Sequence, residues 1–460
     1  MSEQRKIIAE NTADEKNNET KTKVNTVQGG TFSRENNEAD QNISRSEGDN
    51  AEFYVSAENT EENTGGSECP PLEEGAAENI GGEGADASGK EEEKESKPLK
   101  LNLSRHIIAG VLLIIGAAVL FAGRVSREFA DWFCFNIYPV FSGIGSRIWG
   151  IFPFSAAEIL VALVILGSLT GLVFLIRHII RHKGSRARAF LNGFSIAEIT
   201  AAALFLIVTF NCLVGYNRTP FSRYSGLVLR EYTADELKEL TLHLIGEANQ
   251  IAERVDLDGE GRPIKPCDFN KYAVEAMEAL GERYEVLKTY YPQPKGAAAS
   301  EIMSSFNLAG IYFPVTVEAN FNKAMPVSSQ GFTACHELSH LSGFIREDEA
   351  NFIAFIACRD SESTYFRYSG YLGAVSYCLN ALYGSVSREE YSEICGRLSP
   401  VILDEYAFRN EYWAAYRKKV TYKVSSAVND TYLKANNQTD GTKSYGRMVD
   451  LLLAEYFGEQ

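Results

Sequence analysis

This chain of 460 residues contains few histidines, and its net charge is negative. There are six histidines, and none follows His340, so a metal site with a third histidine further along is excluded. Lys and Arg number 45 against 61 Asp and Glu. Such a chain lacks the basic surface that nucleic-acid binding needs, and we expect no nucleic-acid partner.

Aromatic side chains and apolar runs are also missing from the first hundred residues. Phe32, Phe53 and Tyr54 are the only aromatic residues there, and the segment carries −13 of the total charge of −16. This composition cannot bury enough apolar surface to offset the entropy lost on ordering. We therefore expect residues 1–100 to form a disordered acidic tail, and the absence of an apolar stretch near Met1 argues against a signal peptide.

Cysteine is not arranged for a disulfide framework. Eight occur, and the number after residue 216 is odd, which does not suit complete pairing. Cys335, Cys358 and Cys378 stand among apolar residues and are expected to fill core space. We do not expect Cys335 to bind a metal.

Long apolar runs follow the tail. They cover His106–Val125, Ala156–Ile176 and Phe194–Val214. Each is long enough to cross a bilayer, and a buried helix of a soluble protein rarely stays apolar all round for so long. We expect residues 105–215 to be a three-helix transmembrane region in contact with the lipid bilayer.

The positions of Lys and Arg predict the orientation of these spans. Basic residues are frequent before the first span and between the second and third, whereas Arg127 and Arg147 alone lie between the first and second. We therefore expect the N-terminus in the cytoplasm and residues 216–460 outside the cytoplasmic membrane. Glu158 and Glu198 stand near the starts of their spans, so we expect them at the interface rather than on a transport path.

Residues 216–460 have the mixed composition of a globular domain. Residues 234–255 and 268–287 have helical patterns, and Gly310–Phe321 alternates as a strand does. A stretch rich in Pro, Ser and Gly follows, and then another helix. The domain is thus expected to be α+β.

That last helix carries the pattern H-E-x-x-H at His336-Glu337-Leu338-Ser339-His340. Residues i and i+4 share one helix face, so His336 and His340 can bind one metal ion. We expect Zn²⁺, which lowers the pKa of a bound water to near neutral. Glu337 can then accept a proton from that water and pass it to the leaving amine as a general base and acid.

A third metal ligand is required for a catalytic site, and a carboxylate is the best candidate. Glu347 begins the next apolar helix, and Asn351 follows it one turn later. We expect Glu347 to complete the metal site, with Glu349 as its rival on another side of that helix, and Asn351 to hydrogen-bond a ligand imidazole. Gly343 can provide the turn between the two helices.

These motifs resemble those of known families. Glu347-x-x-Ala350-Asn351 after H-E-x-x-H is similar to the ligand element of gluzincin metallopeptidases, whose first Glu is the third zinc ligand. More closely, three spans followed by CHELSH, REDEANFIAF, YFRYSGYLGAVSY and GTKSYGRMVDLLL resemble an uncharacterised bacterial membrane family, a domain of unknown function with a zinc-peptidase motif. The resemblance covers roughly residues 105–455. It implies a mainly α membrane protein: three transmembrane helices plus an α+β gluzincin-like zinc-peptidase ectodomain.

Further catalytic groups are less clearly marked. Peptidases of this kind need a donor for the developing oxyanion, and two Tyr- and Arg-containing segments, residues 366–371 and 444–447, could supply it. We take Tyr371 as the candidate. The β-like segment Tyr312–Glu318 would offer an edge strand that pairs with an extended peptide substrate.

The sequence therefore predicts a membrane-anchored, zinc-dependent metallopeptidase that hydrolyses peptide bonds outside the cytoplasmic membrane. The alternative is a non-catalytic membrane sensor or assembly protein with a structural metal site. An intramembrane protease is not favoured, because H-E-x-x-H lies far beyond the last span. A transporter is not favoured either, because three spans without repeats offer no evident path.

Overall fold

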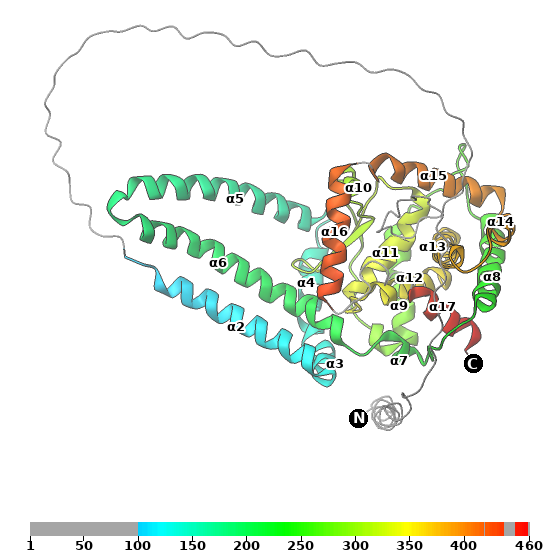
Figure 1. Cartoon of the computed structure of the whole chain (residues 1–460), viewed down its shortest axis with the longest axis horizontal. Coiled ribbons are helices and arrows are strands. Elements are labelled where there is room, and N and C mark those ends of the chain that lie inside the picture. Colours follow the sequence, from blue (N-terminus) through cyan, green and yellow to red (C-terminus); the bar gives the residue numbers. More distant parts are fainter. Residues whose placement is uncertain (1–99, 418, 437–446, 459–460) are drawn as a thin grey trace, which may run out of the picture. The chain divides into compact units, whose positions relative to one another are not determined.

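The computed structural model describes residues 100–417, 419–436 and 447–458. Within these ranges the protein is mainly helical, as predicted, and its strands form one small sheet (Figure 1). The expected disordered tail lies outside the described residues except for its last position.

Three helices are long and apolar enough to cross a membrane, which is consistent with the predicted spans. They are α2 (Leu103–Val125), α5 (Ala156–Arg181) and α6 (Arg186–Asn211), and Figure 1 shows them side by side. The most apolar stretch of α5 contains no buried residue, as expected for a helix surrounded by lipid. The structure is therefore consistent with a membrane protein.

The third span begins and ends earlier than the sequence predicted. We expected Phe194–Val214, but α6 starts at Arg186, because no proline interrupts the residues before Phe194. At its other end, Cys212 leaves the helical backbone region and the 3₁₀ helix η2 (Leu213–Asn217) follows. Some basic residues assigned to the preceding loop consequently lie on the first turn of α6.

Helices α2 and α6 run parallel and contact each other along α2. Nδ1 of His106, near the start of α2, lies 2.5 Å from Oε2 of Glu198, in the middle of α6. Near the end of α2, Gly123 packs against Val214, just past α6. The short η1 (Lys183–Ser185) joins α5 to α6, so α5 runs in the opposite direction. This arrangement brings the C-terminal ends of α2 and α6 to the same end of the bundle.

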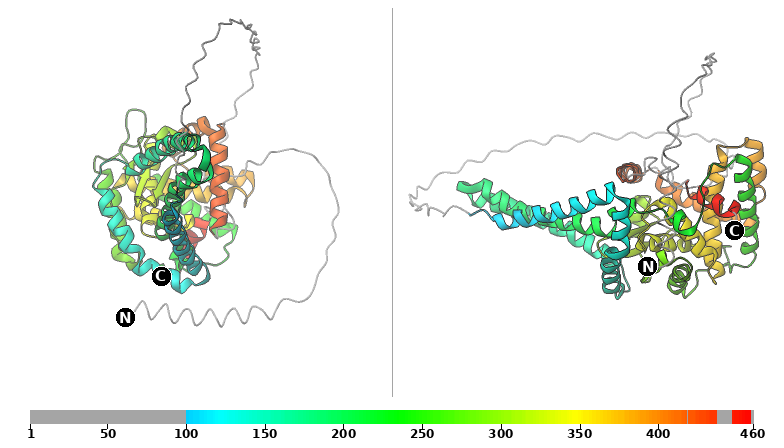
Figure 2. Two further views of the ribbon diagram at one scale, coloured as in Figure 1. Left: turned by 90° about the vertical axis from the view of Figure 1, so that its left-hand side faces the viewer. Right: turned by 90° about the horizontal axis from the view of Figure 1, so that it is seen from below.

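The globular part is built around α11 (Val327–Leu341), which lies in its middle (Figures 1 and 2). This helix packs against α9, α12, α13 and the sheet, and most of its side chains are buried. The helices that surround it or link it to the spans are α3 (Arg127–Asn136), α4 (Tyr138–Gly150), α7 (Phe221–Ser225), α8 (Ala234–Ala252), α9 (Phe269–Arg283), η3 (Glu285–Leu287), α10 (Ser300–Ser305), α12 (Glu347–Arg359), α13 (Thr364–Tyr383), α14 (Arg388–Cys395), α15 (Pro400–Arg417), α16 (Val420–Ala435) and α17 (Met448–Phe457).

The sheet has three short strands in the order β1-β3-β2. β1 is Lys295–Gly296, β2 is Gly310–Phe313 and β3 is Glu318–Phe321. β2 and β3 form an antiparallel hairpin within the segment expected to be β-like, and β1 pairs with β3 in parallel. Among the described residues, no strand lies beside the other edge of β2.

The described cysteines fit the sequence prediction. All seven are free, and Cys335, Cys358 and Cys378 are fully buried. They fill space in the helical core and form no disulfide within the described residues.

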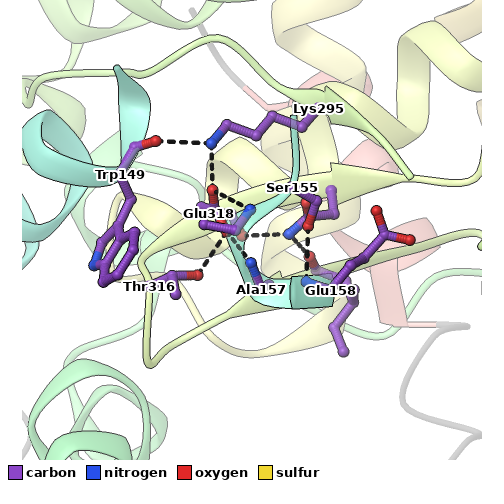
Figure 3. Close-up of polar contacts among 10 residues, drawn as sticks. Trp149, Ser155, Ala157, Glu158, Lys295, Thr316 and Glu318 are labelled. Atoms are coloured by element: carbon purple, nitrogen blue, oxygen red, sulfur yellow. Dashed lines mark hydrogen bonds and ion pairs between the residues drawn. The ribbon is translucent and has the colours of Figure 1, made fainter. Parts of the chain in front are cut away.

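A buried polar network ties α5 to the sheet (Figure 3). Glu318 of β3 accepts hydrogen bonds from the backbone amides of Ala156 (3.1 Å) and Ala157 (2.7 Å), at the first turn of α5. Its carboxylate also pairs with Lys295, whose Nζ donates to the Trp149 carbonyl at 2.8 Å. The negative charge suits the N-terminal end of a helix dipole. The start of this span is thus fixed to the globular part.

Candidate metal centre

The H-E-x-x-H pattern lies on α11, as the sequence predicted. The helix ends at Leu341, and Gly343 turns the chain with a φ of +92°, in the left-handed region that favours glycine. A Cβ at Gly343 would also lie 3.1 Å from atoms of Arg218 and Tyr138. The turn therefore requires glycine, and it returns the chain so that α12 begins at Glu347 beside the end of α11.

The turn brings His336, His340 and Glu347 together. Oε2 of Glu347 lies 3.2 Å from Nε2 of His336 and 3.8 Å from Nε2 of His340. One ligand atom from each side chain lies within 4.8 Å of the others. Two imidazole nitrogens and one carboxylate oxygen in such a group are a donor set that fits a zinc ion.

The protonation state of His340 also suits metal binding. Nδ1 of His340 lies 2.9 Å from the carbonyl oxygen of Phe344, so Nδ1–H donates there and Nε2 keeps its lone pair toward the cluster. Burial, aided by nearby His336, lowers the pKa of His340 to about 4. The ring is therefore neutral at physiological pH, as a ligand must be.

His336 and Glu347 stabilise each other's charged forms in the structure without metal. Burial disfavours the charge on His336, but the hydrogen bond and charge of Glu347, together with the charge of Glu337, outweigh it and raise the pKa of the imidazole. Burial likewise opposes the charge on Glu347, and the two histidines outweigh it and lower the pKa of the carboxyl. Asn351 adds a smaller contribution that raises the pKa of His336. Neither Nδ1 of His336 nor Nδ2 of Asn351 has a hydrogen-bond partner among the described residues, so the expected hydrogen bond to the imidazole is not formed.

Glu349 lies apart from the cluster. Its Oε1 accepts a hydrogen bond of 2.9 Å from the backbone amide of Phe221 and lies 3.9 Å from Arg346. Glu347 and Glu349 are two positions apart on a helix and therefore face different sides. Between the two rival carboxylates, the structure brings Glu347 to the histidines.

Glu337 is buried against the edge strand. Burial raises the pKa of its carboxyl to about 8, and a backbone hydrogen bond from Tyr312 works in the opposite direction. A Cβ at Gly310 would lie only 2.3 Å from Oε1 of Glu337. Glycine at this position thus leaves room for the carboxylate, a constraint that the sequence alone did not reveal.

These groups open onto one cavity of about 500 Å³. Its walls include His336, Glu337, His340 and Glu347, the whole of β2, and residues of α13, α15 and α16. Among the described residues that line it, Arg409 is the only lysine or arginine. No sequence pattern marked Arg409, because it reaches the cavity through the packing of α15.

The comparison with known families covers the second and third spans and this centre. The sequence model of the family DUF3810, described as a protein of unknown function, matches residues 133–453. The chain belongs to the DUF3810 family. The matched segment contains α5, α6, both metal-centre helices and the sheet. No curated protein and no solved structure gives a significant match.

Tyr371, our candidate oxyanion donor, does not line the cavity of this DUF3810 protein. Its ring lies against Phe355 of α12, at 5.7 Å between centroids, and it is not among the residues that line the cavity. Tyr377 of the same helix does line the cavity and contacts Asn351. Six residues of α-helix rotate a side chain by about 240°, so the two tyrosines cannot share a face. The position of Tyr371 therefore does not support the role expected for it.

Three tyrosines that line the cavity near Glu347 are candidates for the oxyanion-donor role expected of Tyr371. Tyr216, Tyr377 and Tyr432 line the cavity, and the charge of Glu347 helps to raise the pKa of each hydroxyl, although burial is the main cause. Tyr445, in the second candidate segment, lies outside the described residues. Arg447 from that segment lies with Nε 3.6 Å from Asp348, and it is not part of the cavity wall.

Proposed function

We propose that this protein is a membrane-anchored zinc metallopeptidase that hydrolyses peptide bonds. His336, His340 and Glu347 would hold the metal, and Glu337 would be the general base. The observation that carries the proposal is the convergence of these four side chains on one cavity whose wall includes an edge strand. The pattern of Lys and Arg residues supports a cytoplasmic N-terminus and an extracytoplasmic location for residues 216–460. These residues would form an α+β gluzincin-like domain.

The donor set suits a catalytic metal better than a structural one. Structural zinc sites are closed by four protein ligands, whereas catalytic sites use three and keep a position open. Within the described residues, the cluster contains three candidate ligands. When bound there, a zinc ion would act as a Lewis acid and lower the pKa of a water molecule it holds. This argues against the alternative of a purely structural metal in a sensor protein.

Glu337 has the position and environment of a proton carrier. It precedes His340 by three residues on one buried helix, and its carboxylate faces the same cavity. Burial raises its pKa to about 8, so the carboxyl alone would be largely protonated at pH 7. A divalent cation nearby would lower this pKa, and the ionised carboxylate could then accept a proton. Glu337 would take a proton from the attacking water and deliver it to the leaving amine.

The free edge of β2 can bind the peptide backbone. The backbone amide of Asn322 donates to the carbonyl of Ala309 at 2.8 Å. Because paired and unpaired positions alternate along an antiparallel strand, the backbone groups of Gly310 and Tyr312 point away from β3. The Tyr312 amide contacts Glu337 on that side, so a substrate would pair with the remaining groups of this edge. An extended substrate would add a strand there, beside Glu337.

The decisive experiment compares the purified full-length protein with Glu337→Gln and His340→Ala. Wild type should contain one equivalent of zinc and cleave members of a quenched-fluorescent peptide library. Glu337→Gln should keep the zinc and lose cleavage, because the amide cannot carry a proton. His340→Ala should lose both. A wild-type protein without stoichiometric metal, or a fully active Glu337→Gln variant, would contradict the proposal.

A further inference from the structure

The edge strand touches the end of a membrane span. Nδ2 of Asn211, the last residue of α6, donates to the carbonyl of Pro314 at 2.8 Å. The hydroxyl of Tyr312 donates to the carbonyl of Asn211 at 3.1 Å. The end of β2 that is nearest Pro314 is therefore fixed at the point where α6 leaves the bilayer.

The metal-centre helices α11 and α12 also contact elements next to the spans. The hydroxyl of Tyr138, in α4, donates to the carbonyl of Leu341 at the end of α11. Gly215 of η2 packs so closely against the α11–α12 turn that a Cβ there would lie 2.7 Å from Ile345. No globular layer separates the candidate metal centre from the membrane region.

The distance between them is short. The rings of Tyr312 and His340 lie 6.4 Å apart, and the Tyr312 hydroxyl already contacts the end of α6. An extended chain advances about 3.3 Å per residue, so roughly five residues would reach from the span's end to the cluster. A segment that leaves the bilayer here reaches the candidate metal centre almost at once.

Residues just beyond the span form part of the cavity wall. Cys212 and Tyr216 line the cavity together with Tyr432 of α16, and the Tyr432 hydroxyl lies 3.6 Å from Sγ of Cys212. Arg124, in the last turn of α2, donates to the carbonyl at Ala435, the end of α16. The cavity is therefore enclosed partly by elements attached to the ends of two spans.

Helix α16 also carries an exposed apolar stripe. Val420, Val424 and Val428 recur every fourth residue and are 76%, 55% and 62% exposed. A stripe of this kind on a helix attached to the span ends suits the surface of the bilayer. It would keep the cavity close to lipid.

We infer that the natural substrate is itself anchored in the membrane, and that the cavity takes its juxtamembrane segment. This inference rests on the proposed peptidase function. The segment would enter at the Pro314 end of β2, pair along Gly310–Phe313, and present a peptide bond to the cluster within a few residues of the bilayer. Confinement to the same membrane raises the effective substrate concentration without any new contact.

The test uses full-length protein reconstituted in vesicles and one cleavable peptide sequence in three forms. The first is soluble, the second follows a transmembrane helix after a spacer of about five residues, and the third follows it after about forty. We expect the short-spacer form to be cleaved at least tenfold faster than the soluble one at equal bulk concentration. The long spacer separates geometry from mere confinement, and it should be cleaved more slowly than the short one.

The outcomes distinguish this inference from the proposed function. Equal rates for the soluble and short-spacer peptides, or the highest rate with the long spacer, would overturn the inference and leave the peptidase function standing. Absence of cleavage of every form by zinc-loaded protein would count against both.

A binding measurement does not depend on turnover. A photo-crosslinking residue at Ile311, which is 40% exposed on β2, can be placed in the Glu337→Gln protein. It should capture the short-spacer peptide in vesicles in preference to the soluble one. Equal capture of both would contradict the inference.

Discussion

Nε2 of His336 lies 3.2 Å from Oε2 of Glu347, although the two residues belong to different helices. The contact depends on the turn at Gly343, which reverses the chain between α11 and α12. Neither helix by itself shows that His336 and Glu347 belong to the same site. Their proximity decides which carboxylate faces the histidines, and it leads directly to the first prediction.

Glu347→Gln should lose zinc, whereas Glu349→Gln should retain it. The Glu347 carboxylate lies among the histidines, while Glu349 accepts the Phe221 amide elsewhere, a bond that Gln can still accept. The loss of affinity for Glu347→Gln should exceed the roughly 10- to 100-fold that removal of an outer partner costs. Metal titration with a chelator series measures this. Loss of zinc from the Glu349 variant alone would reverse the assignment.

Gly310→Ala should impair catalysis without removing the metal. The new methyl group would meet Glu337 at 2.3 Å and displace its carboxylate, and misplacement by about 1 Å can lower a rate roughly 100-fold. Gly296→Ala on β1 is the matched control, because its Cβ would meet its neighbours at an ordinary 3.4 Å. The readouts are kcat and zinc content. Equal effects of the two substitutions would show that crowding of Glu337 is unimportant.

Phe substitutions can locate the oxyanion donor. At least one of Tyr216→Phe, Tyr377→Phe and Tyr432→Phe should lower kcat by about 100-fold or more, because each residue lines the cavity and its hydroxyl is close enough to Glu347 to respond to its charge. Tyr371→Phe, away from the cavity, should leave kcat within about twofold of wild type. If Tyr371→Phe alone lowered kcat, the position described for this side chain would not be the functional one.

The effects of substituting Lys295 and Glu318 on the free energy of unfolding should not be additive, because the two side chains form an ion pair. Both side chains are buried, so removing one leaves an unpaired buried charge, which costs about 3–5 kcal/mol. Lys295→Met combined with Glu318→Gln should cost less than the sum of the single substitutions. Unfolding in detergent provides the double-mutant cycle, and simple additivity would exclude the proposed coupling.

Lys265 should make stability depend on pH above neutrality. Burial lowers its pKa to about 8, beside the Phe269 and Phe321 rings, from about 10.4 in the unfolded chain. The charged form therefore destabilises the fold below pH 8, and this cost disappears as the pH rises toward 10.4.

Lys265→Met removes that titration. The unfolding temperature of the variant minus that of wild type should therefore fall as the pH rises from 7 to 10. The corresponding free-energy change should be on the order of 1 kcal/mol, because the half-buried side chain keeps part of its hydration. A difference that stays constant with pH would contradict the lowered pKa.

Local sequence patterns predicted well the features that depend on a single helix. The apolar length of the spans and the i, i+4 spacing of His336 and His340 are properties of one helix. The boundaries of α6 were wrong by several residues, because apolarity marks the part of a helix in lipid and not its hydrogen-bonded ends. Tyr371 was chosen from a motif without knowledge of which face of α13 meets the cavity.

By itself, the sequence determined that three helices long and apolar enough to span a membrane precede a helix with two histidines on one face, since composition and helical spacing need no tertiary contacts. Only the tertiary structure decided that Glu347 and not Glu349 faces the histidines, that Gly310 makes room for Glu337, and that the cavity lies at the end of α6. These are relationships between elements distant in the chain. They arise from the packing of whole helices and strands, which no local pattern encodes.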